Sequence, residues 1–316
     1  MKSETGELVS RCATLAALLE VSAYPKPGNV HRTQDIPGTR YEQFLAGGVA
    51  VGPAMLRLAE RGFEAEEGSL GWCDIRVGSL VLEAVTDTLS WQRGGNVNLG
   101  SVLLLAPLAA AGGAALHGSP RSDAKKLREK LSKVLENTVP EDAVTIVEAI
   151  RMAMTPRVLG VVEELDVRDE STLNRIRSEK LKPKDLFLRC ADRDSICTEW
   201  VTDFETTFEI GHPYLRRSLE GSDDINSAVV DTFLFILSNR PDSLIARKSG
   251  LKRAEEVSDR ARRILVHGGS RSFEGGEMIR QLDRELQGAR GALNPGTTAD
   301  LAAASLFVAL LEGWRP

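Results

Sequence analysis

The sequence is poor in cysteine, histidine and aromatic residues. Its four cysteines, Cys12, Cys73, Cys190 and Cys197, are scattered over 316 residues and show no CxxC spacing. This pattern argues against both a zinc site and a disulfide framework, and it predicts reduced thiols in a cytoplasmic protein. The four histidines show no HxxxH or HExxH spacing, so the common helical zinc motifs are excluded as well.

Long apolar runs and an excess of one charge are also missing. The best candidate for a membrane span, residues 102–116, is broken by glycine and falls short of the roughly 20 residues that a span needs. The polar N-terminus lacks the apolar region of a secretory signal. With 40 basic and 45 acidic residues, the formal net charge is −5. We therefore expect no association with nucleic acid or membrane, and we leave a homodimer open as the assembly.

No segment alternates polar and apolar residues over the length of a strand, and no fixed-period repeat is present. Alanine, leucine, glutamate and arginine are abundant, as is typical of helical proteins. We predict an all-α fold, a single large helical domain over residues 1–316 packed around a central buried apolar helix. Residues 186–219 form one or two helices, and residues 239–250 form a polar connection. The other expected helices cover residues 8–21, 41–61, 76–91, 101–116, 123–136, 140–154, 225–237, 251–266, 277–290 and 297–316.

The usual nucleotide and hydrolase motifs, GxGxxG, GxxxxGK[ST] and GxSxG, are absent. The most distinctive stretch is a glycine-broken polar turn that leads directly into the central apolar helix. Gly94, Gly95 and Gly100 permit positive φ or a close backbone approach. Asn96 and Asn98 place amides near a helix N-terminus, which favours an anion. Either the turn is part of a binding site or it is a plain helix cap.

A second polar island covers Glu20 and residues 25–35. Its prolines stiffen the loop, and Lys26 and Arg32 are cations suited to a phosphate. The loop also carries Asp35. A proline-rich turn with solvated charges is the alternative.

Acidic residues suggest a magnesium site. Asp166 and Asp169 are three positions apart, so one helical turn would point both the same way, as Mg²⁺ ligands. An acidic run is also typical of a solvated face. Asp231 lies within an apolar helix, where a charge is costly unless it is paired or bound to a metal. Arg193 and Asp194 form a further charged pair.

The last two islands follow the apolar helix that contains Asp231. Residues 241–250 include Asp242 and the cations Arg247 and Lys248, which suit ion pairing or phosphate binding. Residues 294–300 have the pattern of a helix cap, which accounts for them by itself but also presents N–H groups to an anion.

Taken in order, these islands resemble the triphosphoribosyl-dephospho-coenzyme A synthase family. The similarity spans nearly the whole chain, and the ordered set is specific although no single piece is. The matching pieces are residues 20–21, 25–28, 95–100, 231–232, 242–250, Asp283 and residues 294–301.

The resemblance implies an all-helical enzyme that transfers the triphosphoribosyl unit of ATP to the ribose 2′-hydroxyl of dephospho-coenzyme A and releases adenine. ATP and Mg²⁺ would be required, and the partners would be small nucleotides. Residues 96–100 read Asn-Val-Asn-Leu-Gly where better-known members carry Asn-Thr-His-Lys-Gly, and residues 29–32 read Asn-Val-His-Arg in place of Leu-Val-Asp-Arg. The chain therefore looks like a divergent branch found in archaea and in bacteria with methanopterin-type one-carbon metabolism. A nucleotide-dependent step in making such a one-carbon carrier is the alternative function, and a non-catalytic helical scaffold is a third.

Displacement of adenine from C1′ passes through an oxocarbenium-like centre. A nearby carboxylate can stabilise this centre or take the proton of the acceptor hydroxyl. We predict Asp35, Asp231 and Asp242 as catalytic residues, and Asp166, Asp169 and Asp231 as Mg²⁺ ligands. The predicted nucleotide-binding residues are Lys26, Gly28, Asn29, Arg32, Asn96, Asn98, Gly100, Arg247, Lys248, Asn294, Gly296, Thr297 and Asp300.

Overall fold

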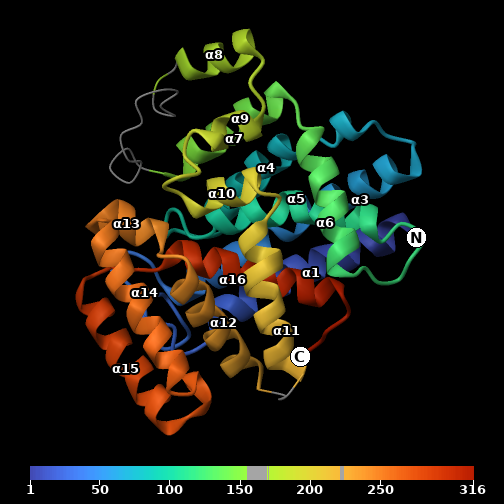
Figure 1. Cartoon of the computed structure of the whole chain (residues 1–316). Helices are drawn as coiled ribbons and strands as arrows, with labels where there is room; N and C mark the ends of the chain where they lie inside the picture. The colour runs from blue at the N-terminus through green and yellow to red at the C-terminus, as the bar shows by residue number, and fades with distance from the viewer. Residues whose placement is uncertain (155–168, 170, 221–223) are drawn as a thin grey trace.

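The structure is a computed structural model that describes residues 1–154, 169, 171–220 and 224–316 (Figure 1). Within these residues the chain forms helices and no strand, apart from two isolated β-bridges in the loop before residue 40. The all-α prediction is confirmed. Most buried apolar side chains belong to one continuous cluster, so the helices share one core. Across the described ranges, we find no helix of the length and apolarity that a membrane crossing requires.

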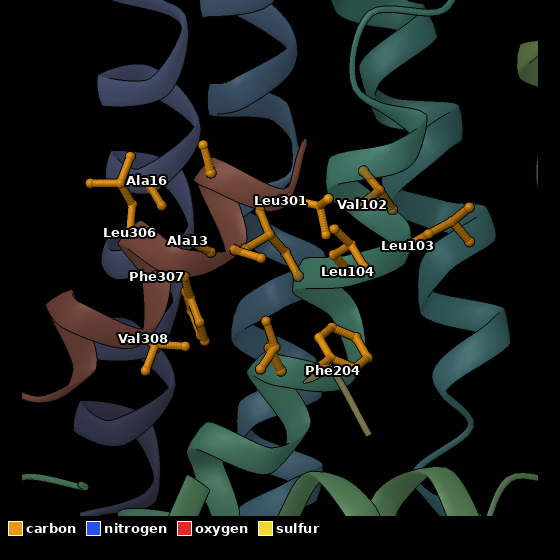
Figure 2. Close-up of a cluster of buried hydrophobic side chains, with 14 of the residues drawn as sticks. Ala13, Ala16, Val102, Leu103, Leu104, Phe204, Leu301, Leu306, Phe307 and Val308 are labelled. Carbon is orange, nitrogen blue, oxygen red and sulfur yellow. The ribbon is translucent and has the colours of Figure 1, made fainter. Parts of the chain in front are cut away.

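Two almost wholly apolar helices occupy the centre of this core. Every residue of α5 (Leu99–Ala115) is buried except Gly100 and Ser101, and every residue of α16 (Gly296–Leu311) is buried except Gly296 and Asp300. Figure 2 shows Leu301 of α16 facing Leu104 of α5. The four exceptions lie in the first turns of the two helices. The polar ends of the two central helices are therefore the places where the core meets a surface.

The outer helices enclose this pair on different sides. α1 (Lys2–Ser22), α3 (Gly52–Glu67), α4 (Val77–Trp91) and α6 (Ala124–Glu136) contact α5, and α1, α11 and α12 contact α16. α13, α14 and α15 group at one side of the molecule, and α7 to α10 at another (Figure 1). The remaining bounds are α2 (Tyr41–Ala50), α7 (Pro140–Ala153), α8 (Ser171–Glu179), α9 (Pro183–Leu188), α10 (Ser195–Val201), α11 (His212–Glu220), α12 (Ile225–Asn239), α13 (Ser243–Ser249), α14 (Leu251–Val266), α15 (Phe273–Gly288) and the short turns η1 (Trp72–Asp74), η2 (Thr206–Gly211) and η3 (Gly269–Arg271).

The last helix ends at Leu311 and does not reach the C-terminus as predicted. Three other predicted segments also differ from the structure. Residues 41–61 form two helices, because the chain turns at Val51 and Pro53 opens a new helix, where its missing N–H costs no hydrogen bond. Residues 239–250 contain α13, which the polar composition of that stretch concealed. Residues 186–219 contain the end of α9, α10, the π-helical turn η2 and most of α11.

The prediction of four reduced cysteines is wrong for one pair. Cys190 and Cys197 form a disulfide, with their Cα atoms 5.8 Å apart, whereas Cys12 and Cys73 are free. The chain folds back between the end of α9 and the start of α10, which brings the two side chains together. No CxxC spacing marks this pair in the sequence.

Helices α3 and α5 approach until their backbones touch. A Cβ atom at Gly62 would lie 1.9 Å from the carbonyl oxygen of Ala110, and one at Gly113 would lie 1.9 Å from that of Ala59. Real Cβ atoms do not come so close to backbone atoms. Any side chain at either glycine therefore has to push the two helices apart.

We expect Gly62→Ala to lower the free energy of unfolding by about 1–3 kcal/mol, because an extra methyl group in a close-packed contact forces the backbone to shift. The matched control is Gly276→Ala on α15, where the nearest atom to an added Cβ is the flexible end of Arg280 at 3.6 Å. Urea denaturation of both variants measures the difference. Equal stability of Gly62→Ala and the unsubstituted chain would contradict the close contact.

Candidate active site

A cavity of about 1090 Å³ opens beside the first turns of α5 and α16. The loop before α2, the α9–α10 connection, α13 and the apolar face of α7 complete its wall. Single small-molecule sites usually measure 300–1000 Å³. The cavity is therefore large enough for a nucleotide together with part of a second ligand.

The structure brings most of the predicted nucleotide-binding residues to this one place, although they are dispersed along the sequence. Of the thirteen, ten line the cavity. Lys26, Gly28 and Arg32 are the exceptions. The ten are Asn29, Asn96, Asn98, Gly100, Arg247, Lys248, Asn294, Gly296, Thr297 and Asp300.

Ionisable groups gather on the inner side of the cavity. Glu20, at the end of α1, and Asp300, in the first turn of α16, both line it. Lys26 is fully buried behind them, and its ammonium group donates to Glu20 Oε1. Burial raises the pKa of Glu20 and lowers that of Lys26, while the attraction between the two opposes both changes. Lys26 therefore pairs with Glu20 inside the protein and does not reach the cavity wall as the predicted phosphate ligand.

Asp300 joins the two central helices. The Ser101 hydroxyl donates to its Oδ1 over 2.6 Å, and a Cβ atom at Gly100 would lie only 2.0 Å from its Oδ2. The close approach expected of Gly100 is thus observed, and Asp300 is the group that approaches. Burial and the negative charges of Glu20 and Asp242 raise the pKa of Asp300, and the Ser101 hydrogen bonds lower it, with a net value of about 8.

Asp242, which was predicted as a catalytic residue, is hydrogen-bonded by the protein at both carboxylate oxygens. Its Oδ1 accepts from the N–H groups of Leu244 and Ile245, and its Oδ2 accepts from the N–H and the hydroxyl of Thr298, all at 2.8–3.0 Å. These four bonds use the lone-pair positions of a carboxylate. Asp242 therefore caps α13 and ties it to α16, and this geometry leaves no position for a substrate proton or a metal.

The asparagines of the cavity wall differ in how many hydrogen bonds their side-chain amides form with the protein. Asn96 Oδ1 accepts from Leu99 N (3.1 Å), and the Asn98 amide accepts from Gly48 N and donates to Val97 O, both at 3.0 Å. Asn29 donates weakly to Pro295 O. Asn294 Oδ1, by contrast, is buried and receives no hydrogen bond from any described residue. An unpaired buried acceptor is costly, so a ligand that donates to it would be favoured.

Cations surround the outer part of the cavity. Arg189, Arg193, Arg247, Lys248 and Arg290 all line it. Arg247 forms an ion pair with Asp194 (2.8 Å), and Lys248 donates to the Gly291 carbonyl (3.0 Å). Arg189 and Arg290 were not predicted, because single arginines in separate loops carry no pattern in the sequence.

Two further predicted residues lie in the loop before α2 but outside the cavity wall. Arg32 is exposed, with its guanidinium 5.6 Å from the centre of the Tyr24 ring. Asp35 is exposed and accepts from Tyr41 N (2.8 Å) at the start of α2. The Gly28 N–H donates to Asp283 on α15 (2.9 Å), which anchors the loop. The neighbouring Ile36 and Pro37, rather than the charged residues, reach the cavity.

The predicted magnesium ligands are not brought together among the described residues. Asp231 is buried on α12, outside the cavity wall, and accepts from Ser270 N (2.7 Å). Asp169 is exposed and its carboxylate accepts from Ser171 N (2.9 Å), while Asp166 lies outside the described residues. In the part of the chain that the structure covers, no three acidic, histidine or cysteine side chains cluster as a metal site would.

Comparison with known proteins gives consistent results. The model of the ATP:dephospho-CoA triphosphoribosyl transferase (CitG) family matches residues 6–316. A solved structure from Archaeoglobus fulgidus, provisionally named triphosphoribosyl-dephospho-CoA synthase, aligns with a TM-score of 0.63 and 26% identity over 86% of this chain and 100% of that one.

Curated relatives provisionally named 2-(5″-triphosphoribosyl)-3′-dephosphocoenzyme-A synthase match more locally. One from Azotobacter vinelandii is 37% identical over 102 residues, which are 32% of this chain and 34% of the relative. One from Pseudomonas syringae pv. tomato is 34% identical over 111 residues, 34% of this chain and 37% of the relative. The chain thus spans about a third of the length of the curated relatives that it matches.

Proposed function

The chain belongs to the ATP:dephospho-CoA triphosphoribosyl transferase family, and on this premise we propose that it transfers the triphosphoribosyl group of ATP to a hydroxyl of a dephospho-CoA-like acceptor. Adenine is the other product. One observation carries the proposal: one large cavity combines exposed cations at its outer part with the carboxyl groups of Glu20 and Asp300 at its inner part. A polyphosphate needs the first feature, and a reacting sugar carbon needs the second.

The reaction exchanges one bond at C1′ of the ATP ribose for another. The C1′–N9 bond breaks, and its electron pair leaves with adenine, which takes up a proton. The acceptor oxygen bonds to C1′ and loses its own proton. Positive charge develops at C1′ in between, so nearby carboxylates lower the barrier.

Glu20 and Asp300 fit the carboxylate roles better than the residues predicted from sequence. Both line the cavity. Asp35 is exposed in a loop, Asp231 lies outside the cavity wall, and the oxygens of Asp242 are filled by four hydrogen bonds. We therefore assign the chemistry to the inner end of the cavity.

Mg²⁺ would enter with the triphosphate. Magnesium commonly takes most of its ligands from phosphates and water and only one or two from protein carboxylates. The described residues, which offer no cluster of three ligands, fit that mode and not an all-protein site. Asp192, which lines the cavity between Arg189 and Arg193, is a suitable single ligand. When bound, the ion would neutralise phosphate charge.

The cations would hold the triphosphate, so we expect Arg193→Ala to raise KM for ATP about tenfold, as the loss of one charged hydrogen bond does. The difference should shrink at high salt, because screening weakens exposed charge interactions. The control is Arg284→Ala, an exposed arginine on α15 that is not part of the cavity wall. An unchanged KM for Arg193→Ala would argue against a phosphate at this position.

The decisive experiment follows the leaving group. The protein is incubated with base-labelled ATP, Mg²⁺ and dephospho-CoA, and the products are separated and weighed by mass spectrometry. Free adenine and a triphosphoribosyl adduct are expected. ADP or phosphate without adenine would refute the proposal. Because residues 96–100 depart from better-known members, the acceptor panel should include precursors of pterin-type one-carbon carriers, which test the alternative function.

A further inference from the structure

Asp300 differs from the neighbouring carboxyl groups of Glu20 and Asp242 because the protein supplies it with fewer hydrogen-bond and ion-pair partners. Glu20 is paired with Lys26, and both oxygens of Asp242 accept two hydrogen bonds each. Asp300 forms no ion pair with any described residue, and its carboxyl group is hydrogen-bonded only by Ser101 among these residues, through the hydroxyl and the backbone N–H. A carboxylate has about four acceptor positions. Asp300 therefore keeps acceptor capacity that the protein itself does not fill.

Its position is nevertheless fixed. Asp300 belongs to the first turn of α16, where it and Gly296 are the two residues that escape full burial, and it lines the cavity. Ser101 holds Oδ1 at 2.6 Å, and the bare Cα of Gly100 lets Oδ2 lie against α5. Two rigid core helices thus aim one carboxyl group at the ligand space. Such support from packed elements is what precise chemistry requires.

We propose that Asp300 is the base that takes the proton from the acceptor hydroxyl, and that Ser101 is its positioning residue. The inference rests on the proposed function. As the acceptor oxygen forms its bond to C1′, the O–H bond breaks and the proton passes to Asp300, while the electron pair of the broken C1′–N9 bond leaves with adenine. The proton on Asp300 is afterwards released to water.

The surroundings tune this group to work near neutral pH. Burial, Glu20 from α1 and Asp242 from the start of α13 raise the pKa of Asp300, whereas Ser101 lowers it, with a resulting value of about 8. Lys26 also interacts with Asp300 and favours its charged form. A base whose pKa lies near the working pH can both take up and release its proton quickly.

The test is the pH dependence of kcat/KM, which reports groups of the free enzyme. A base must be deprotonated, so kcat/KM should rise with pH and level off above about 8. Ser101→Ala removes a hydrogen bond that favours the carboxylate, so its rise should move to higher pH by about one unit. Ser305→Ala removes a hydroxyl that donates to Leu301 O further along α16, outside the cavity wall, and should leave the profile unchanged.

The variant Asp300→Asn is a second test. Adenine release and, by calorimetry, ATP binding are measured on the same preparation. We expect kcat to fall about 100-fold or more while ATP still binds, since general base catalysis contributes on the order of 10²–10⁴. A profile that falls with pH near 8, an unshifted Ser101→Ala profile, or an active Asp300→Asn variant would overturn the assignment to Asp300. Absence of adenine release by the unsubstituted protein would instead refute the proposed function.

Discussion

Gly100→Ala is expected to reduce adenine release about 100-fold while the protein stays folded. The added Cβ atom would lie 2.0 Å from Asp300 Oδ2 and 2.6 Å from Asp300 Cγ. The core helices cannot easily move, so the carboxyl group has to rotate away from Ser101 and from its place in the cavity. Misplacement of a reacting group by about 1 Å commonly costs a factor of about 10².

Steady-state kinetics and thermal unfolding of the same preparations distinguish a loss of activity from a loss of stability. The control is Gly288→Ala at the end of α15, where an added Cβ meets no atom within 4 Å. That variant should keep full activity and equal or slightly higher stability, because alanine is the better helix former. If Gly100→Ala retained its activity, the position of Asp300 would not matter to the reaction.

Lys26→Met is expected to lower the free energy of unfolding by about 3–5 kcal/mol. The substitution leaves Glu20 as a buried carboxyl group without its partner, and breaking a buried ion pair in this way has costs of that size. Lys26 is fully buried and Glu20 is 7% exposed, so solvent replaces little of the lost contact. The double variant Glu20→Gln, Lys26→Met removes both charges and should recover most of the loss. Urea denaturation measures all three proteins.

The sign of the pH dependence provides a further check on this pair. Burial already raises the pKa of Glu20 in the folded protein, and loss of Lys26 raises it further. A carboxyl group with a raised folded pKa contributes stability below its unfolded pKa, about 4.3, and that contribution is lost as pH rises through the folded value. The deficit of Lys26→Met should therefore be small near pH 4 and largest at neutral pH. A deficit that is the same at both pH values would exclude an unpaired Glu20 as its cause.

Local patterns in the sequence were sufficient for much of the fold. Asp123 and Asp224 stand directly before α6 and α12 and accept hydrogen bonds from the first turns of these helices. The apolar run after the central turn formed α5, and Gly100 in its first turn allowed a close approach. Helix formation and capping depend on residues within a turn or two of each other, so the sequence displays them directly.

Only the tertiary structure decided which polar groups do what. Asp242 and Asp300 look alike in the sequence, yet the first is filled by hydrogen bonds from α13 and α16 and the second opens on the cavity. Lys26 is turned inward to Glu20, and Cys190 meets Cys197. These outcomes depend on how separate helices pack, and hence on burial and on contacts that helical periodicity does not encode. The sequence determined the helices and the polar residues at their ends. Packing determined which of those polar residues can still accept a hydrogen bond from a ligand.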